Sequence, residues 1–316
     1  MDFDSIQDFR SNFANIYHKS VVPMLKPFEK KKKNVMYRSI AVWFMLILAG
    51  GLYLYLNMPL IKQTKDTDAI MCFLMVAIVI VVVGCAITSW LCKSFENKLK
   101  EKIMPSIMKA FGNFIWTSTG TIDGYTIKDS NLFTRFETKK DDDCFSGTYK
   151  GLEIKINETE LTYTTRDSKG NRHTHTEFKG VIAQIDVKKP FKGHTIIRKR
   201  SLLNTCSYQE IKLEDPEFSR MYFVDGNDQV ESRYILTTSF MERFKNIKNA
   251  FRASQMEASL KNNKILIAIS TNKDLFKLGS ITKPINDTKQ FTELLNEFIS
   301  ILSIVDELKL NQNVGL

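Results

Sequence analysis

The sequence predicts an α+β protein in which an N-terminal two-helix transmembrane hairpin with cytoplasmic helical extensions precedes a mainly antiparallel β-sheet domain with two packed helices. Three observations support this prediction. Two apolar runs without a charged side chain lie near the N-terminus, alternation of apolar residues with a period of two begins near residue 114, and two amphipathic helical patterns lie further along the chain. Strands followed by helices in this order favour α+β over a doubly wound fold.

Composition limits the classes of protein that fit. The 316 residues are enough for a membrane segment and one sizeable soluble domain. A formal net charge of +10 points first to the anionic cytoplasmic leaflet and not to nucleic acid, because the chain has a membrane segment. Three of the five cysteines lie in the second apolar run, and Cys144 and Cys206 form no CxxC pair, so we expect neither a disulfide framework nor a zinc knuckle.

The apolar runs extend from Ile40 to Leu56 and from Ala69 to Cys92. A spanning helix needs about 20 apolar residues, so we predict spans at about 39–58 and 69–92. Buried core helices are the alternative, but two runs of this length are rare in soluble folds. A cleaved signal peptide fits less well, because a long charged leader precedes the first run and a second run follows it.

Charges beside the two runs predict their orientation. The basic residues before the first run are Lys26, Lys30, Lys31, Lys32, Lys33 and Arg38, and those after the second are Lys93, Lys98, Lys100 and Lys102. Positive flanks face the cytoplasm, so both termini are expected there. The neutral connector from Lys62 to Asp68 is then on the far side. Trp43 and Trp90 would mark the inner interface, and Tyr53 and Tyr55 the outer one.

Neither run contains an Asp, Glu, His, Lys or Arg side chain, which argues against a transport pathway through the membrane. Gly50, Gly51 and the Gly84 to Thr88 spacing allow close helix approach, either inside one hairpin or between copies of the chain. Both possibilities are open at this stage.

Apolar stripes flank the membrane segment. Phe3, Ile6, Phe9, Phe13, Ile16 and Tyr17 form one, and Phe95, Leu99, Ile103, Ile107 and Phe111 form the other. Mutual packing of these helices is the favoured interpretation, and a partner-binding stalk is the alternative. Pro23, Pro27 and Pro105 are expected to interrupt or end the helices. The predicted domains are a cytoplasmic amphipathic segment 1–36, the transmembrane hairpin 37–92, a juxtamembrane helix 93–113 and a cytoplasmic α+β domain 114–316.

Within the last domain, strands are predicted from short alternating segments. These are 152–156, 161–163, 174–178, 181–187, 195–197, 210–213, 221–224 and 264–269, with a hairpin turn at 167–171. One helix is predicted from Ser239, with Glu242 completing a capping box, and another from near Asp287. Both should pack on the sheet.

Candidate catalytic and metal sites are weak. Cys144 has no local nucleophile signature. His173 and His175 share one strand face with Glu177, but an exposed hairpin is favoured over a metal site there. Asp141 to Asp143 precede a glycine and are expected to form a solvated turn, not a cation site. The sequence contains no P-loop, Rossmann glycine fingerprint, HExxH or GxSxG motif. We expect no cofactor and assign no catalytic or metal-binding residue.

A basic stretch is the most suggestive surface feature. Its residues are Lys188, Lys189, Lys192, Arg198, Lys199 and Arg200. In a domain tethered near a negative membrane surface, these side chains are candidate contacts for anionic lipid headgroups. A solvated hairpin without a ligand is the alternative. Nucleic-acid binding is not expected, because Phe191 alone does not form an aromatic platform.

Several segments resemble an uncharacterised family of bacterial membrane proteins, catalogued as domain of unknown function 3137. They are Phe178 to Gly180, Phe191 to Thr195, Asp228 to Leu236, Ser239 to Arg243 and Lys264 to Ile269. The resemblance implies a bacterial inner-membrane location and carries no catalytic residue. From the residues themselves, Glu231 and Arg233 beside Tyr234 are interpreted as a buried or half-buried polar anchor at a sheet–helix junction.

Together these features predict a non-catalytic, membrane-tethered cytoplasmic module that binds a lipid headgroup, a small ligand or a partner protein. Its expected partners are the lipid bilayer, anionic headgroups, and another protein or a second copy through the hairpin. Two alternatives are open: an enzyme acting at the inner membrane with an unrecognised site, and an accessory subunit of a larger membrane complex.

Overall fold

The computed structural model describes residues 6–61, 66–188, 190–201, 207–250, 253–273, 275–279, 281, 284–285 and 288–307. The chain forms two compact units. The hairpin unit comprises residues 16–106 and 278–291. The sheet unit comprises residues 1–15, 107–277 and 292–316.

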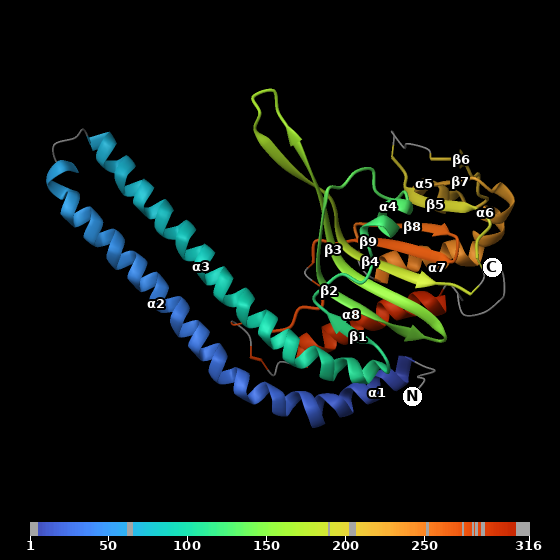
Figure 1. Ribbon diagram of the computed structural model, residues 1–316, viewed down its shortest axis with the longest axis horizontal. Coiled ribbons are helices and arrows are strands. Elements are labelled where there is room, and N and C mark those ends of the chain that lie inside the picture. Colours follow the sequence, from blue (N-terminus) through green and yellow to red (C-terminus); the bar gives the residue numbers. More distant parts are fainter. Residues whose placement is uncertain are drawn as a thin grey trace. The chain divides into compact units, whose positions relative to one another are not determined.

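Two long helices dominate the hairpin unit, α2 (Val22–Ile61) and α3 (Asp66–Met108). They run beside each other in Figure 1. Each has an 18-residue apolar window that is only 6% buried, and each is long and apolar enough to cross a membrane. A core helix of a soluble protein would bury such a window, so the exposure favours a lipid environment.

Glycines bring these two helices into close contact. A Cβ atom placed on Gly84 would lie 2.8 Å from the Trp43 ring, and one on Gly50 would lie 2.4 Å from the Ile80 side chain. A Cβ on Gly51 would meet nothing within 4 Å. Gly50 and Gly84 therefore serve close packing inside the hairpin, which is one of the two possibilities that the sequence left open.

The prolines do not act as the sequence predicted. Pro27 lies inside α2 and Pro105 inside α3, so the expected breaks at these positions are wrong. An interior proline costs about 3 kcal/mol. Burial of neighbouring apolar side chains such as Leu25 and Ile103, at 2% and 0% exposure, offsets that cost. The departure from α-helical geometry comes earlier, in a π-helical turn at Tyr17–Val21 just before Pro23.

The N-terminal stripe packs within the chain. In the sheet unit, Phe9 of α1 (Ile6–Ile16) contacts Phe111 and Tyr149 with ring centroids 5.5 and 5.7 Å apart. In the hairpin unit, Phe28 faces Phe95 at 6.3 Å. The predicted mutual packing of the two stripes is therefore observed where Phe9 meets Phe111.

The sheet unit is built on one nine-stranded sheet with the order β1-β2-β3-β4-β9-β8-β5-β7-β6 (Figure 1). Every neighbouring pair is antiparallel, which confirms the α+β prediction. The strands are β1 (Ile115–Thr117), β2 (Thr138–Tyr149), β3 (Leu152–Arg166), β4 (Arg172–Asp186), β5 (His194–Lys199), β6 (Gln209–Glu210), β7 (Tyr222–Gly226), β8 (Gln255–Lys261) and β9 (Lys264–Ser270). The helices are α4 (Gly124–Asp129), α5 (Pro216–Met221), α6 (Gln229–Ile235), α7 (Thr238–Ala250) and α8 (Thr288–Glu307).

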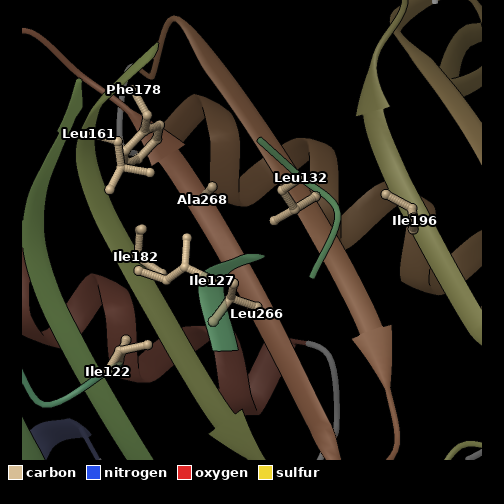
Figure 2. Packing of buried hydrophobic residues seen from close by; sticks show 9 residues of the cluster. All are labelled: Ile122, Ile127, Leu132, Leu161, Phe178, Ile182, Ile196, Leu266 and Ala268. Carbon is tan, nitrogen blue, oxygen red and sulfur yellow. The ribbon is translucent and has the colours of Figure 1, made fainter. Parts of the chain in front are cut away.

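Both faces of the sheet are buried. One face carries the cluster in Figure 2, where Ile127 of α4 lies near Ile182 and Leu266 and the cluster extends to Leu161 and Ile196. On the other face, Phe298 of α8 lies 5.2 Å from Phe145 of β2 and 4.3 Å from Phe111 between ring centroids. Burial on both faces explains why apolar runs such as Val181 to Ile185 do not alternate cleanly.

Two local predictions need correction. Asp141 to Asp143 do not form a solvated turn, because they lie in β2 at a bulge and Asp143 is fully buried. The helix expected from Ser239 begins at Thr238, and Thr237 is the residue whose hydroxyl accepts the capping N–H bond, from Phe240. The start expected for the last helix, Asp287, lies outside the described residues, and α8 is described from Thr288.

Candidate functional site: a polar cleft at the end of β5

Strand β5 separates the predicted basic stretch into two groups. Lys188 and Lys192 have exposed side chains before the strand begins, whereas Arg198 and Lys199 end it. Six residues of extended chain span about 20 Å, so the two groups cannot form one continuous patch through neighbouring side chains. Lys189 lies outside the described residues.

Arg198 is held by a network of protein groups. Its guanidinium donates to Asp225 Oδ1 at 2.6 Å, to the carbonyl of Asn131 at 2.8 Å and to Ser207 Oγ at 2.9 Å. Asp225 is fully buried, and its Oδ2 accepts the backbone N–H groups of Ser207 and Tyr208 at 2.7 and 2.9 Å. A buried carboxylate needs such partners, so this network fixes the end of β5 against β7.

Arg200 is held in a similar way at the strand end. Its Nε donates to the carbonyl of Ser219 at 2.6 Å, and its guanidinium pairs with Glu210 at 3.0 Å. The guanidinium carbon also lies 5.5 Å from the centroid of the Phe223 ring. Arg198 and Arg200 thus contact the protein, while Lys188 and Lys192 have exposed side chains.

A cleft of about 500 Å³ opens beside Arg198. Its walls are Asn131, Leu132, Phe133, Thr134, Glu177, Phe178, Arg198, Lys199, Ser207, Gln255, Glu257 and Ser270. The residues come from the segment after α4, from β4, β5, β8 and β9, and, for Ser207, from the segment before β6. Charges of both signs, hydroxyl groups and amides line it together with two aromatic rings. This lining suits a ligand that offers both donors and acceptors.

Two carboxyl groups in the cleft are oriented by backbone N–H groups. Glu177 accepts the N–H of Thr134 at 2.7 Å, and Glu257 accepts the N–H of Lys199 at 2.9 Å. Burial raises the pKa of the Glu257 carboxyl, although the Lys199 N–H works in the opposite direction. These bonds hold both side chains in place before any ligand enters, which lowers the entropic cost of binding.

At the opposite end of β5, two of the segments that carry the family resemblance contact each other. The Glu231 carboxylate accepts the backbone N–H groups of Lys192 and Gly193 at 2.8 and 2.6 Å. Glu231 is therefore a half-buried anchor, as predicted. Arg233 is exposed, so including it in the anchor was wrong.

His194 is buried between β7 and β8 and is a structural residue. Its Nδ1 lies 3.1 Å from the Tyr208 hydroxyl, and its Nε2 lies 2.8 Å from Ser259 Oγ. Burial, reinforced by the charge of Lys261, lowers the pKa of His194 to about 4. The imidazole is therefore neutral at physiological pH. His194 was not among the residues singled out from the sequence, although it lies in the Phe191 to Thr195 segment that resembles the family.

The other sequence candidates are accounted for by local contacts. Cys144 is fully buried, and burial, aided by the charge of Asp141, raises the pKa of its thiol to about 12, so the thiol stays protonated. His173 lies 3.3 Å from Asp167, and His175 Nε2 lies 2.8 Å from Thr165 Oγ1. Among the described residues, no group of three or more His, Cys, Asp or Glu side chains is arranged to hold a metal.

The acidic run in β2 is satisfied by neighbours. Asp143 accepts the Trp116 indole N–H at 2.8 Å, and Asp141 accepts the Thr159 hydroxyl at 2.7 Å and pairs with Lys139. These bonds explain why the run lies inside the sheet instead of in a solvated turn.

These features define a class of protein. Its members join an apolar two-helix hairpin to an antiparallel α+β unit that contains a polar cleft. Residues 176–310 match the family model described as "Protein of unknown function (DUF3137)". Over these residues, the match confirms the resemblance inferred from the sequence.

No curated protein matches the chain. Among solved structures, the crystal structure of the mycobacterial trehalose monomycolate transport factor A, TtfA, is similar at 10% sequence identity. The match covers 62% of this chain and 90% of that chain, with a TM-score of 0.33. A TM-score this low supports no conclusion about fold or function.

Proposed function

We propose that this chain is a non-catalytic binding module tethered to the bacterial inner membrane, with α2 and α3 spanning the bilayer and both termini in the cytoplasm. The sheet unit binds a small polar ligand or a short peptide segment in the cleft beside Arg198. No proton transfer or bond cleavage is part of this function.

The observation that carries the proposal is the contrast between the two units. The apolar windows of α2 and α3 expose side chains such as Phe44 and Ile47, at 65% and 61%, which only lipid or another apolar surface can accommodate at low cost. The cleft, in contrast, has polar walls whose orientation is already fixed by Asp225, Thr134 and Lys199. Anchoring and polar recognition are thus divided between the units.

A variant that fills the cleft tests the binding function. Thr134 is exposed at the cleft wall, and only its backbone N–H takes part in the bond to Glu177, so Thr134→Trp should block the cleft without breaking that bond. Thr174→Trp on the exposed hairpin of β3 and β4 is the matched control. The measurement is the thermal unfolding midpoint of the full chain in detergent, with amino acids, dipeptides and purely anionic compounds added in turn.

We expect a compound carrying both charges to raise the midpoint of the parent chain and of Thr174→Trp, but not of Thr134→Trp, because ligand binding to the folded state stabilises it. If no compound of either class raises the parent midpoint, or if Thr134→Trp responds as the parent does, the cleft is not the ligand site.

Fewer residues of the basic stretch are now candidates for contact with anionic headgroups. Arg198 and Arg200 already make contacts inside the protein, and Lys188 and Lys192 are the exposed members of the stretch before β5. We propose that these two lysines carry any headgroup contact made by the sheet unit. A Lys188→Gln, Lys192→Gln double variant would then bind anionic liposomes more weakly than Arg200→Gln.

One observation favours an enzyme as the second candidate function. Glu257 lines the cleft, and burial raises the pKa of its carboxyl, which is the direction that a general acid requires. If the chain is an enzyme, Glu257→Gln would abolish turnover of a cleft ligand while leaving its binding intact. If it is a binding module, the variant would change affinity alone.

A further inference from the structure

A groove lies between α2 and α3 within the hairpin unit, beyond the apolar run of each helix. Its volume is about 500 Å³. Met24, Pro27 and Phe28 of α2 form an apolar floor, and Lys31, Lys98, Lys102 and Glu101 line the remainder. The groove shares no residue with the cleft of the sheet unit.

The floor is held in place by packing between the two helices. Phe28 is only 5% exposed and faces Phe95 of α3, with ring centroids 6.3 Å apart. Lys31 Nζ lies 4.8 Å from the centroid of the Phe28 ring. The aliphatic stem and the ammonium group of Lys31 are thereby held over an aromatic face. The groove is therefore a preformed feature of the helix pair.

The charge of the groove and of its surroundings is strongly positive. Three ammonium groups face one carboxylate, that of Glu101. Residues 22–39 contain six basic and one acidic side chain, and residues 93–108 contain four basic and two acidic ones. These two segments thus carry a net charge of +7, out of +10 for the whole chain. An anion is the complementary ligand.

The sequence positions put the groove at the level of lipid headgroups. Lys98 follows the apolar run by six residues, and Lys31 precedes the other run by nine, which is about 9 and 14 Å along a helix. The headgroup layer extends roughly 5–8 Å beyond the hydrocarbon core, and lysine side chains can extend towards it along the helix. Lys31 and Lys98 are the lysines of the groove nearest the membrane.

We propose that this groove is a binding site for the headgroup of an anionic phospholipid. The phosphodiester lies between the ammonium groups of Lys31 and Lys98, and the headgroup substituent lies over Pro27 and Phe28 towards Lys102. Glu101 opposes binding through its charge. The inference rests on the proposed membrane placement of α2 and α3, and basic pockets between helices at a membrane surface are known to take such headgroups.

Three variants of the full chain test the proposal. The groove variant is Lys31→Gln, Lys98→Gln, Lys102→Gln. The control is Lys26→Gln, Lys30→Gln, Lys33→Gln, which removes the same charge from exposed lysines that do not line the groove. Glu101→Gln is the third. Native mass spectrometry of the chain in detergent then measures the binding of phosphatidylglycerol and of phosphatidylcholine with the same acyl chains.

We expect the groove variant to bind phosphatidylglycerol at least about tenfold more weakly than the parent, from the contribution of each lysine near an anionic group. The control should stay within about threefold, and Glu101→Gln should bind more tightly. A gain of binding in Glu101→Gln cannot arise from misfolding, so the proposal remains testable even if the groove variant is unstable.

Several results would overturn the proposal. If the groove variant and the control lost the same amount of phosphatidylglycerol affinity, the lipid would be attracted to the basic helices without a specific site. Equal binding of phosphatidylcholine would exclude recognition of the anionic headgroup. Displacement of phosphatidylglycerol by millimolar inorganic phosphate, or by an acidic peptide, would assign the groove to a soluble anion or a protein segment instead.

The failure of this inference and the failure of the proposed function are distinguishable. Carbonate extraction of membranes reports anchoring, and all three variants should stay in the pellet, because none alters an apolar run. Loss of the parent chain from the pellet would contradict the membrane placement. Normal anchoring with unchanged lipid binding by the groove variant would contradict the groove alone.

Discussion

Burial determines the role of individual charged residues in the sheet unit, so residues that are neighbours in the sequence can have different roles. Arg198 is 13% exposed at its side chain and pairs with Asp225, which is fully buried. Two positions later, Arg200 pairs with Glu210 at a surface where the side chains are 39% and 44% exposed. The Arg198–Asp225 pair also satisfies hydrogen bonds of neighbouring backbone groups, whereas the attraction between Arg200 and Glu210 is screened by water.

This difference predicts unequal costs of removing the carboxylate. Asp225→Ala should lower the free energy of unfolding by about 3–5 kcal/mol, because it leaves Arg198 and two backbone N–H groups without their partner. Glu210→Ala should lower it by less than about 1 kcal/mol. Chemical unfolding of the full chain in detergent, followed by near-ultraviolet circular dichroism, measures both. Similar costs for the two variants would contradict the assigned role of Asp225.

His194 predicts a pH dependence of stability. Its pKa is about 4 in the folded protein, against an ordinary value of 6.5, so the unfolded chain binds the proton more readily between these two values. The contribution of neutral His194 to the free energy of unfolding is fully present above pH 6.5 and is lost as the pH falls towards 4. The change corresponds to about 3 kcal/mol.

The measurement compares the parent chain with His194→Gln between pH 7 and pH 4. Other groups titrate in both proteins, so the difference between them isolates His194. We expect the parent to lose about 3 kcal/mol more than the variant across this range. Parallel pH profiles would show that the imidazole is not held neutral by its burial.

The sequence identified some side chains of the candidate site and missed the site itself. Arg198 and Lys199 were singled out because they lie in a basic run. Asp225, which binds Arg198, and Glu257, which lines the cleft, were not, and Glu177 was considered only beside His173 and His175, because the three carboxylates come from different strands. Their convergence depends on the β4-β9-β8-β5-β7 order, which pairs strands distant in sequence and leaves no local pattern. The segments shared with the family were a better guide, since Glu231 and Lys192 do contact each other.

At the scale of elements, most of the periodic segments were predicted, although the strand β8 was not, and the irregular segments were missed. The helix α7 and the strands β5, β7 and β9 lie within a few residues of their predicted bounds. β2 was missed because three aspartates hide its pattern, and their partners Trp116 and Thr159 are distant in sequence. The short helices α4, α5 and α6 each have six or seven residues, too few for a periodic stripe.

One glycine determines how two central strands pair. Gly180 has φ of +151°, and a Cβ atom there would lie 2.1 Å from the carbonyl oxygen of Ile269. Because the obstacle is backbone, it cannot rotate away. Gly180→Ala should therefore destabilise the sheet unit by about 2 kcal/mol or more and loosen the β4–β9 pairing.

Gly124→Ala is the control, since a Cβ there meets nothing within 4 Å, and its effect should stay within about 0.5 kcal/mol. Hydrogen exchange of the 264–270 peptide locates the change. We expect faster exchange in Gly180→Ala only. Unchanged protection of β9 in that variant would show that the strands can shift to accept the methyl group.

At the scale of the whole molecule, the apolar surface and the positive charge lie in the same two helices. The net charge of +7 in residues 22–39 and 93–108 lies beside uncharged runs on both helices. Since α2 and α3 are joined by a short connector, both basic segments belong to the same side of any membrane that the runs cross. This arrangement predicts that the sheet unit and the N-terminal segment share one compartment.

Site-directed labelling tests that prediction directly. In a cysteine-free full chain, single cysteines are introduced by Ser20→Cys before the first run, Thr64→Cys in the connector and Ser168→Cys in the exposed turn of the β3–β4 hairpin. A membrane-impermeant maleimide added to intact spheroplasts should label only the connector position. When it is added to inverted vesicles, it should label only the other two positions. Labelling of Ser168→Cys from outside would reverse the orientation, and labelling of Ser20→Cys and Ser168→Cys from opposite sides would show that only one helix spans the membrane.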